Sequence, residues 1–352
     1  MGDLYRPGAI LDYPVGGSGA VVDALVRGIE LNGGSVRLST HVERINVEAG
    51  RAVGVTLRGG EVLPASAVVS NADAWATVRL LPEEARPVAR PERGGALNSG
   101  LAKTDSFMHL HLGFRAAAGE LAGMGLGIHY SVVLDDFEDI CKDNNMVIIS
   151  IPTLLDPGLA PEGHHVLHAY YAADEPYAPW AGLDRRSPEY AALKPSLTLT
   201  LALTLALALP NPNPNPNPNP NPNPSPNPSP NPRYAALKRE RAKPLWAAVE
   251  KLIPDIKERL VVELVGTPLT HERFLRRSEG TYGPPLFAPG GGGETIPYAG
   301  TPVPGLLHCG DSTFPGIGLP SAAASGMNAA NTLVSPLEQL ALLQEIEDVR
   351  KQ

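Results

Sequence analysis

The chain has 352 residues and a formal net charge of -8, with 43% hydrophobic and 19% charged residues. This length allows about two domains with buried cores, and the hydrophobic content excludes a wholly disordered chain. Because 37 acidic residues outnumber 29 basic ones, no broad basic surface is available for a phosphate backbone, and we do not expect nucleic acid as a partner. The two cysteines, Cys141 and Cys309, cannot build a disulfide framework, which suits a reducing compartment and leaves at most one bridge.

We find no targeting or membrane-spanning pattern in the sequence. Residues 1–17 have neither the charged start and apolar core of a signal peptide nor the Arg- and Ser-rich character of a transit peptide. A leucine-rich run without charges, 197–209, has 13 residues, whereas a helix needs about 20 to cross a bilayer. We therefore expect no transmembrane anchor, and contact with a membrane surface stays open.

The first predicted element is a helix over residues 21–30. Val21, Leu25 and Ile29 recur at helical spacing, and the Asn-Gly-Gly sequence at 32–34 is typical of a helix end. The glycines before it, in VGGSGAVV, resemble the start of a dinucleotide-binding motif. Val22 stands where the third glycine belongs, and no acidic residue ends a strand about 20 positions later. We interpret this segment as a helix start near a cofactor or substrate.

Short β-strands are predicted next, and further strands in the middle of the chain. Alternating or β-branched segments between turn signals favour them. They cover residues 35–40, 42–48, 52–57, 67–72, 106–114, 145–152, 164–171 and 260–268. A helix interrupted by Pro244 is predicted over 239–255, and the chain closes with a strand at 305–311 and a small-residue helix at 320–335. The pattern predicts helices combined with a mixed or antiparallel sheet.

A low-complexity insert occupies about 195–233. Leucine alternates there with Thr or Ala, then proline alternates with Asn or Ser, and YAALK precedes and follows the segment at 190–194 and 234–238. A repeated hexanucleotide that encodes Leu-Thr in one reading frame encodes Pro-Asn in another, so one DNA repeat can account for both halves of the insert. We interpret the insert as a repeat expansion or a retained intron, and expect the proline part to be extended and disordered because it lacks backbone donors.

The segment CGDSTFPGIGLP, residues 309–320, carries the strongest sign of chemistry. A strand leads into Asp311, a glycine bend and a helix that begins near Pro320. A helix start offers unpaired N–H groups and the positive end of a dipole, and small residues allow a ligand to approach. The same pattern also fits a buried strand, turn and helix packed through alanines. Both interpretations stay open on the residues alone.

Histidines and arginines give two further candidate sites. His109 and His111 share one strand face, and a second predicted strand carries His164, His165 and His168. No carboxylate at matching spacing completes a ligand set, so we do not expect a metal. The motif RFLRRSEGTYGP at 273–284 contains three arginines that either neutralise cofactor phosphates or form a solvated face. No catalytic acid, base or nucleophile can be named from spacing.

Four segments together resemble the carotenoid isomerases of plants and algae, within the phytoene-desaturase and flavin amine-oxidase superfamily. They are residues 13–60, AVVSNADAW at 67–75, RFLRRSEGTYGP at 273–284 and CGDSTFPGIGLPSAAASG at 309–326. The resemblance covers nearly all of the chain outside the insert. It implies an α/β fold, with a Rossmann-like FAD-binding domain and an α+β substrate domain on a mixed sheet. The implied boundaries are 1–75 and 266–340 for the FAD domain, 76–265 for the substrate domain, and 341–352 for a tail.

The resemblance also implies a cofactor, FAD, and the residues that contact it. Val42 would contact the adenine through its backbone, and Asn71 would lie beside the flavin domain. Gly310 and Asp311 would contact the ribityl-phosphate part, and the helix start would face the flavin ring. The cofactor-binding residues implied are Val42, Asn71, Gly310, Asp311, Gly316, Ile317, Gly318, Leu319 and Pro320.

The implied activity is cis–trans isomerisation of poly-cis lycopene to the all-trans form in a plastid, with no net redox change. The substrate would be a long polyene reached from a membrane surface. A carotenoid desaturase and an inactive flavin-fold fragment are the alternatives. The family begins with a strand-GxGxxG-helix unit, the first βαβ unit of the Rossmann-like domain, which is missing from this sequence. We therefore expect weak or no FAD binding by this chain alone, and the sequence indicates no oligomeric state.

Overall fold

A computed structural model of the chain describes residues 14–88, 97–117, 119–140, 142–183, 232–284 and 296–350. The described residues form two compact units, each assembled from segments that are far apart in the sequence. The first unit takes its residues from 1–28, 108–171 and 178–267, and the second from 29–107, 172–177 and 268–352. Cys141 and the predicted insert up to residue 231 lie outside the described residues.

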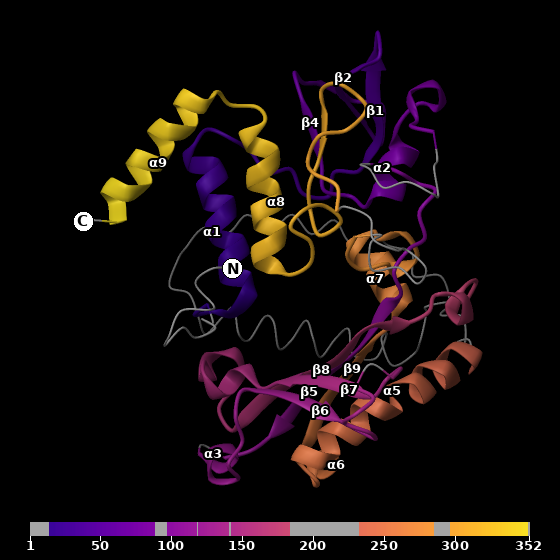
Figure 1. Cartoon of the computed structure of the whole chain (residues 1–352). Helices are drawn as coiled ribbons and strands as arrows, with labels where there is room; N and C mark the ends of the chain where they lie inside the picture. The colour runs from indigo at the N-terminus through magenta and orange to yellow at the C-terminus, as the bar shows by residue number, and fades with distance from the viewer. Residues whose placement is uncertain are drawn as a thin grey trace. The chain divides into compact units, whose positions relative to one another are not determined.

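The first unit is built on a five-stranded sheet with the order β6-β7-β8-β5-β9 (Figure 1). The strands are β5 (Ser106–Arg115), β6 (His129–Val133), β7 (Met146–Ser150), β8 (His164–Glu175) and β9 (Leu260–Gly266). The pairs β6–β7, β7–β8 and β5–β9 are antiparallel. Strands β5, β7, β8 and β9 confirm the sequence prediction, whereas the short strand β6 was not predicted.

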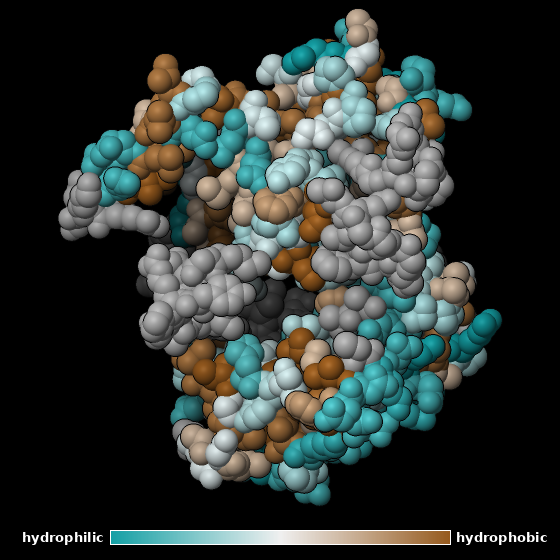
Figure 2. All heavy atoms as spheres, in the orientation of Figure 1, coloured by the Kyte–Doolittle hydropathy of each residue, from teal (hydrophilic) through white to brown (hydrophobic). Residues whose placement is uncertain are grey.

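Side chains alternate between the two faces of this sheet. In β5, Leu110, Leu112 and Phe114 are buried, while the intervening His109 and His111 are partly or fully exposed. Helix α5 (Pro232–Leu252) covers the buried face, because its residues Leu245 and Val249 are fully buried and the Tyr171 hydroxyl of β8 donates to the carbonyl of Arg241 at 2.9 Å. Figure 2 shows hydrophilic side chains along the outer side of α5.

Helix α5 continues through Pro244, so the predicted interruption at this residue was wrong. An interior proline costs about 3 kcal/mol because it removes one hydrogen bond and crowds the preceding turn. On both sides of Pro244 the helix buries apolar side chains, among them Ala242 and Leu245, and this packing holds the helix together. Pro232 and Arg233, at the end of the predicted insert, form the first turn of α5, a position that tolerates proline.

Short helices complete the first unit. They are α3 (Glu120–Gly123), α6 (Ile256–Arg259), and the 3-10 turns η3 (Pro152–Leu154), η4 (Pro157–Leu159) and η5 (Ala178–Trp180). The guanidinium of Arg259 bridges Glu120 and Asp255 at 2.6 and 2.7 Å. Helix α1 (Gly17–Leu31) confirms the predicted first helix, and its residues are divided between the two units.

The second unit contains two small sheets. Strands β1 (Val42–Glu48), β2 (Arg51–Leu57) and β3 (Val62–Pro64) form an antiparallel sheet in this order. Strand β4 (Val68–Ser70) pairs in parallel with β10 (Leu306–His308), which comes from the other end of the chain. A shared core joins both sheets, and its buried members are Ile45, Ala52, Val78, Leu81, Leu97, Val303 and Leu306.

The remaining helices belong to the second unit. They are α2 (Ala74–Leu80), α7 (Pro268–Leu275), α8 (Leu319–Asn331), α9 (Pro336–Arg350), η2 (Glu83–Ala85) and η6 (Ser278–Gly280). The strand predicted at 35–40 was wrong, because Ser39 adopts a positive φ of 54° and turns the chain. Arg37 in this segment pairs with Glu61 instead, at 2.9 Å.

The structure confirms the α/β fold class. No helix among the described residues is both long enough and apolar enough to cross a membrane. The assignment of one unit to a cofactor and the other to a substrate stays a prediction, because the structure shows how the chain is partitioned and not what each unit binds.

Candidate cofactor-binding site

The candidate site lies where the parallel strands β4 and β10 of the second unit end. Parallel strands place their carboxyl ends at the same edge of a sheet, where α/β proteins commonly bind ligands. The loop after β4 contains Asn71, and the loop after β10 contains Gly310 and Asp311. The backbone N–H of Cys309 donates to the carbonyl of Ser70 at 2.9 Å and extends the pairing. The two loops therefore start side by side.

Asn71 and Gly310 are in such close contact that no side chain fits at position 310. A Cβ atom on Gly310 would lie 2.2 Å from Oδ1 of Asn71, and the φ of Gly310 is +101°. Both the space and the backbone angle require glycine. The structure thus brings together two of the residues predicted to lie at the cofactor.

Hydrogen bonds fix the turn at Gly310. Its N–H donates to Oγ of Ser325, in α8, at 2.7 Å, and its carbonyl accepts from the hydroxyl of Thr313 at 2.8 Å. Ser325 in turn donates to the carbonyl of Ala322 at 2.6 Å. Ser325 therefore holds the turn against α8. This is the packing role that the sequence offered as one interpretation of the small residues in this helix.

Asp311 is held by two groups of the motif RFLRRSEGTYGP. Nη1 of Arg277 donates to Oδ1 of Asp311 at 2.5 Å, and the backbone N–H of Gly283 donates to Oδ2 at 3.2 Å. Arg277 also donates to the hydroxyl of Ser312 at 3.3 Å and to the carbonyl of Thr281 at 3.0 Å. A carboxylate has about four acceptor sites, so Asp311 keeps capacity for a ligand hydroxyl while its orientation is fixed.

A second buried carboxylate, Asp73, connects the other loop to the same motif. It caps α2 by accepting from the N–H of Ala76 at 2.6 Å, and it accepts from the N–H and the hydroxyl of Ser278 at 2.6 and 3.0 Å. Nη2 of Arg79 donates to the same Ser278 hydroxyl at 2.8 Å. Asp73 and Arg277 therefore hold both sides of the segment 277–283 against the two loops.

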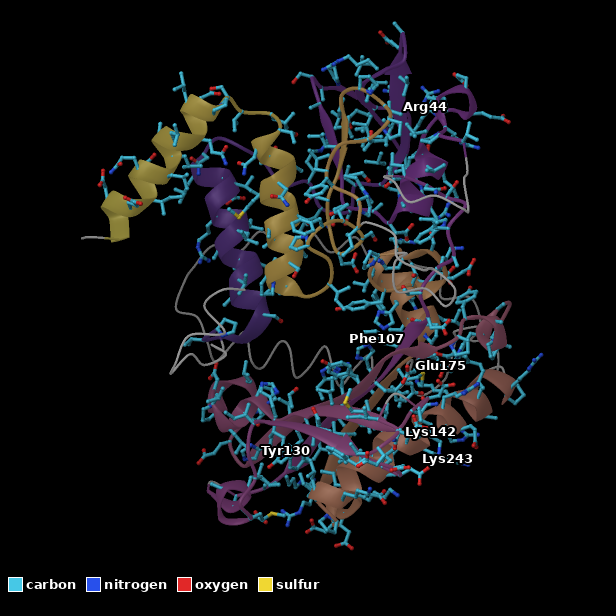
Figure 3. The ribbon with its side chains drawn as sticks, in the orientation of Figure 1. Arg44, Phe107, Tyr130, Lys142, Glu175 and Lys243 are labelled. Carbon is cyan, nitrogen blue, oxygen red and sulfur yellow. The ribbon has the colours of Figure 1, made fainter. Side chains whose placement is uncertain are left out.

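The Gly-Thr-Tyr-Gly turn at 280–283 is also anchored to the start of β5. A Cβ on Gly280 would lie 2.5 Å from the carbonyl oxygen of Pro268, and its φ is +66°, so the turn requires glycine. The hydroxyl of Ser106 donates to the Gly280 carbonyl at 2.7 Å. The rings of Phe107, labelled in Figure 3, and Tyr282 pack with centroids 4.2 Å apart.

Helix α8 begins without a side-chain cap. Gly318 is its N-cap residue, with a φ of 95°, and Pro320 lies in the first turn. Ile317 and Leu319 are exposed to 44% and 56%. A Cβ built on Gly316 would lie 3.9 Å from Cδ1 of Ile296, and one on Gly318 would lie 4.0 Å from Cδ of Pro320, which are ordinary contact distances. Backbone donors at a helix start without a side-chain cap fit an anionic or carbonyl-bearing ring system such as a flavin.

His308 forms a hydrogen bond with the loop after β4. Its Nε2 donates to the carbonyl of Ala72 at 2.6 Å, and burial lowers its pKa. The imidazole is therefore neutral, with the proton on Nε2, and Nδ1 is buried without a hydrogen-bond partner. Burial also raises the pKa of the neighbouring Cys309 thiol, which keeps this thiol protonated and unreactive.

The structure places most predicted residues at this edge of the second unit, with one exception. Val42 is the first residue of β1, in the antiparallel sheet, where it pairs with Leu57. Sequence reasoning missed Asp73 and Ser278, and it left Arg277 as one of three equivalent arginines. An Asp before a short apolar helix is a typical N-cap signal and would have indicated Asp73.

The first unit contains a groove of about 660 Å³ between α5 and the edge strand β9. Lys238, Lys243 and Trp246 of α5 and Glu263 of β9 are among its lining residues. Figure 3 labels Lys243 on α5. None of its lining residues is a predicted cofactor contact.

Comparison with known proteins agrees with the motifs at the β4–β10 edge. Residues 1–193 match the family described as flavin containing amine oxidoreductase. The chain belongs to this family. Proteins of this family share a flavin cofactor. This agrees with the start of α8, which has no side-chain cap.

Similar curated proteins include plant and bacterial enzymes. The chain is 29% identical over 328 residues to "Prolycopene isomerase, chloroplastic" of Arabidopsis thaliana, which covers 93% of this chain and 46% of that protein. The same protein of Daucus carota is 29% identical over 329 residues, covering 93% and 45%. "Phytoene desaturase (neurosporene-forming)" of Cereibacter sphaeroides is 36% identical over 169 residues, covering 45% and 31%. The chain spans about half the length of the curated plant relatives it matches.

Among solved structures, an oxidoreductase from Methanosarcina mazei is similar with a TM-score of 0.47 and 18% identity. The match covers 90% of this chain and 55% of that one.

Proposed function

We propose that this chain supplies the flavin-ring side of an FAD site in an enzyme of carotenoid metabolism. The observation that carries the proposal is the meeting of Asn71 with Gly310 and Asp311 at the ends of two parallel strands, next to an uncapped helix start. Membership of the flavin amine oxidoreductase family supports a flavin as the ligand. The choice of FAD rests on the resemblance to the carotenoid isomerases.

Each of the proposed contact residues has a physical role. Asp311, fixed by Arg277, accepts a hydrogen bond from a ribityl hydroxyl. The start of α8 follows Gly316 and includes Gly318 and Pro320. The helix dipole there stabilises negative charge on a bound ring. Ile317 and Leu319 offer apolar contact beside it. A bound flavin would supply the redox chemistry, while these residues bind and orient it.

The proposed substrate is a long polyene, and the proposed reaction is isomerisation of poly-cis lycopene to the all-trans form. Matches to prolycopene isomerases across 93% of the chain support this choice. Desaturation is the second candidate, because the shorter match to phytoene desaturase has a higher identity of 36%. A plastid location and a peripheral membrane contact are further proposals that rest on the same plant relatives.

Pigment analysis in a carotenoid-producing bacterial host tests the proposal. The chain would be expressed with poly-cis lycopene or with desaturation intermediates as substrate, and the products would be separated and weighed by mass spectrometry. An isomerase yields a product of unchanged mass, whereas a desaturase removes two hydrogens for each new double bond. Pigments identical to those of the empty-vector control, with correctly folded protein present, would contradict both activities for this chain.

A further inference from the structure

Three histidine side chains gather on the face of the five-stranded sheet that lies opposite α5. His109 and His111 are two residues apart in β5 and so project from the same face. His168 comes from β8, the neighbouring strand. One ring nitrogen from each of the three lies within 4.8 Å of the others. The sequence placed these histidines in two separate strands, and the pairing of β5 with β8 brings His168 to His109 and His111.

Two of these imidazoles already face each other through their nitrogen atoms. Nδ1 of His109 and Nε2 of His168 are 2.8 Å apart, and the ring planes differ by 12°. The centroids are 5.1 Å apart, as expected for rings joined edge to edge by one N–H···N hydrogen bond. The ring of His111 lies parallel to that of His168, with centroids 4.3 Å apart. A single proton therefore occupies the space between two in-plane lone pairs.

The surroundings of the cluster favour the neutral form of its imidazoles. Burial lowers the pKa of His168 to about 3, with a smaller contribution from His111, and burial lowers the pKa of His111 as well. Both imidazoles are therefore neutral near pH 7, and neutral imidazole is the form that binds metal ions. Three neutral nitrogen donors satisfy a late first-row metal better than a hard cation such as Ca²⁺, which prefers oxygen.

We propose that His109, His111 and His168 form a binding site for a divalent cation of the zinc class. Zn–N distances of about 2.0–2.1 Å place two nitrogens of a tetrahedral site roughly 3.3 Å apart. The 2.8 Å pair would open as the metal takes the place of the shared proton, and this proton would move to the other nitrogen of its own ring, so that both imidazoles stay neutral. His111 would supply the third nitrogen, which lies within 4.8 Å of the other two, and a tetrahedral site then has a fourth position for water.

The surroundings of the cluster hold the rings in place. Gly266 of β9 lies opposite His109, and a Cβ there would be 3.3 Å from Cβ of His109, so only glycine leaves the ring room without displacement. The ring of Tyr170 packs beside His168 and His109, with centroids 5.0 and 5.7 Å away. Such neighbours orient metal-binding imidazoles and raise affinity. Every residue of this cluster belongs to the first unit, so the site does not depend on the proposed flavin contacts.

Metal titration of the full chain tests the site. Metal-free protein would be titrated with Co²⁺, whose visible absorption reports nitrogen ligands in a tetrahedral site, and Zn²⁺ would then be added to displace it. We expect one equivalent to bind. His111→Gln and His168→Gln should each weaken binding at least about tenfold, whereas His164→Gln should not, because His164 is not a member of the cluster and its Nδ1 bonds to the backbone carbonyl of Glu162. Circular dichroism of each variant checks that it is folded.

A measurement on the unmodified chain makes the test independent of the variants. In an NMR spectrum of the histidine side chains, Zn²⁺ should shift the ring resonances of three of the nine histidines. Absence of saturable binding, or equal loss of binding in the His164→Gln control, would overturn the proposal. The three rings would then be a hydrogen-bonded packing cluster on the sheet.

Discussion

Arg277 and Asp311, 34 positions apart in the chain, form an ion pair at 2.5 Å in which their side chains are only 11% and 17% exposed. The pair joins the RFLRRSEGTYGP motif to the CGDSTFPGIGLP motif. Because the shielded guanidinium fixes the carboxylate, Arg277 is a positioning residue for the proposed flavin contact of Asp311.

Replacing Arg277 with Gln should destabilise the second unit. The substitution leaves Asp311 with the N–H of Gly283 as its remaining partner, and loss of a charged hydrogen bond at a shielded site costs about 2–3 kcal/mol. Urea unfolding gives the free energy directly. Arg58→Gln is the matched control, since its pair with Glu43 is 70% and 49% exposed and should cost about 1 kcal/mol or less. Equal effects of the two substitutions would argue against a structural role for the Arg277 pair.

Gly310→Ala should be more harmful than its backbone angle alone explains. The new Cβ would meet Oδ1 of Asn71 at 2.2 Å. Gly59→Ala is the control, because Gly59 has a nearly identical φ of +100° with open space around it, and strain there costs about 1–2 kcal/mol. The difference between the two variants in unfolding free energy measures the contact. Adding Asn71→Ala to Gly310→Ala should restore part of the loss, and strictly additive effects would show that the contact is not made.

Asp73→Ala should loosen both the start of α2 and the segment around Ser278. The cap alone is worth about 1 kcal/mol, and two further hydrogen bonds from Ser278 are lost with it, so we expect a total of about 3 kcal/mol. Hydrogen exchange should increase at 74–80 and at 276–281 together. Ser335→Ala removes an exposed cap of α9 with no distant partner and should affect α9 only. Faster exchange confined to α2 in the Asp73 variant would show that Ser278 is held by other contacts.

The histidine cluster should make stability depend on pH. The folded state lowers the pKa of His168 from 6.5 to about 3, so the unfolded chain takes up a proton at higher pH than the folded chain. The free energy of unfolding is therefore highest above pH 6.5, where His168 is neutral in both states. It falls progressively as the pH drops from 6.5 towards 3, because the unfolded chain then binds a proton that the folded chain does not. His168→Phe should flatten this dependence in urea unfolding at pH 5.0 and 7.5, while His164→Gln should leave it unchanged. An unchanged slope in the His168 variant would contradict a lowered pKa of His168 in the folded chain.

The sequence predicted those helices and strands whose pattern of apolar and polar residues is visible within their own segment. Strand β5 alternates between buried and more exposed positions from Met108 onward, and α8 begins near Pro320, as expected from the motif. The continuity of α5 through Pro244 was not predictable, because packing on the sheet decides it. The pairing of Arg277 with Asp311, the bridge from Asp73 to Ser278, and the meeting of His168 with His109 all join residues distant in sequence. These contacts depend on the tertiary fold, and local pattern carries no information about them.

Hydrogen–deuterium exchange of the chain with and without FAD tests the central claim most directly. At FAD concentrations up to the millimolar range, we expect weak but saturable binding, with slower exchange at 71–76 and 309–325. Asp311→Asn should reduce both the affinity and this protection. Saturable protection at the α5–β9 groove or elsewhere, without protection at 71–76 and 309–325, would contradict the assignment of the β4–β10 edge as the flavin site.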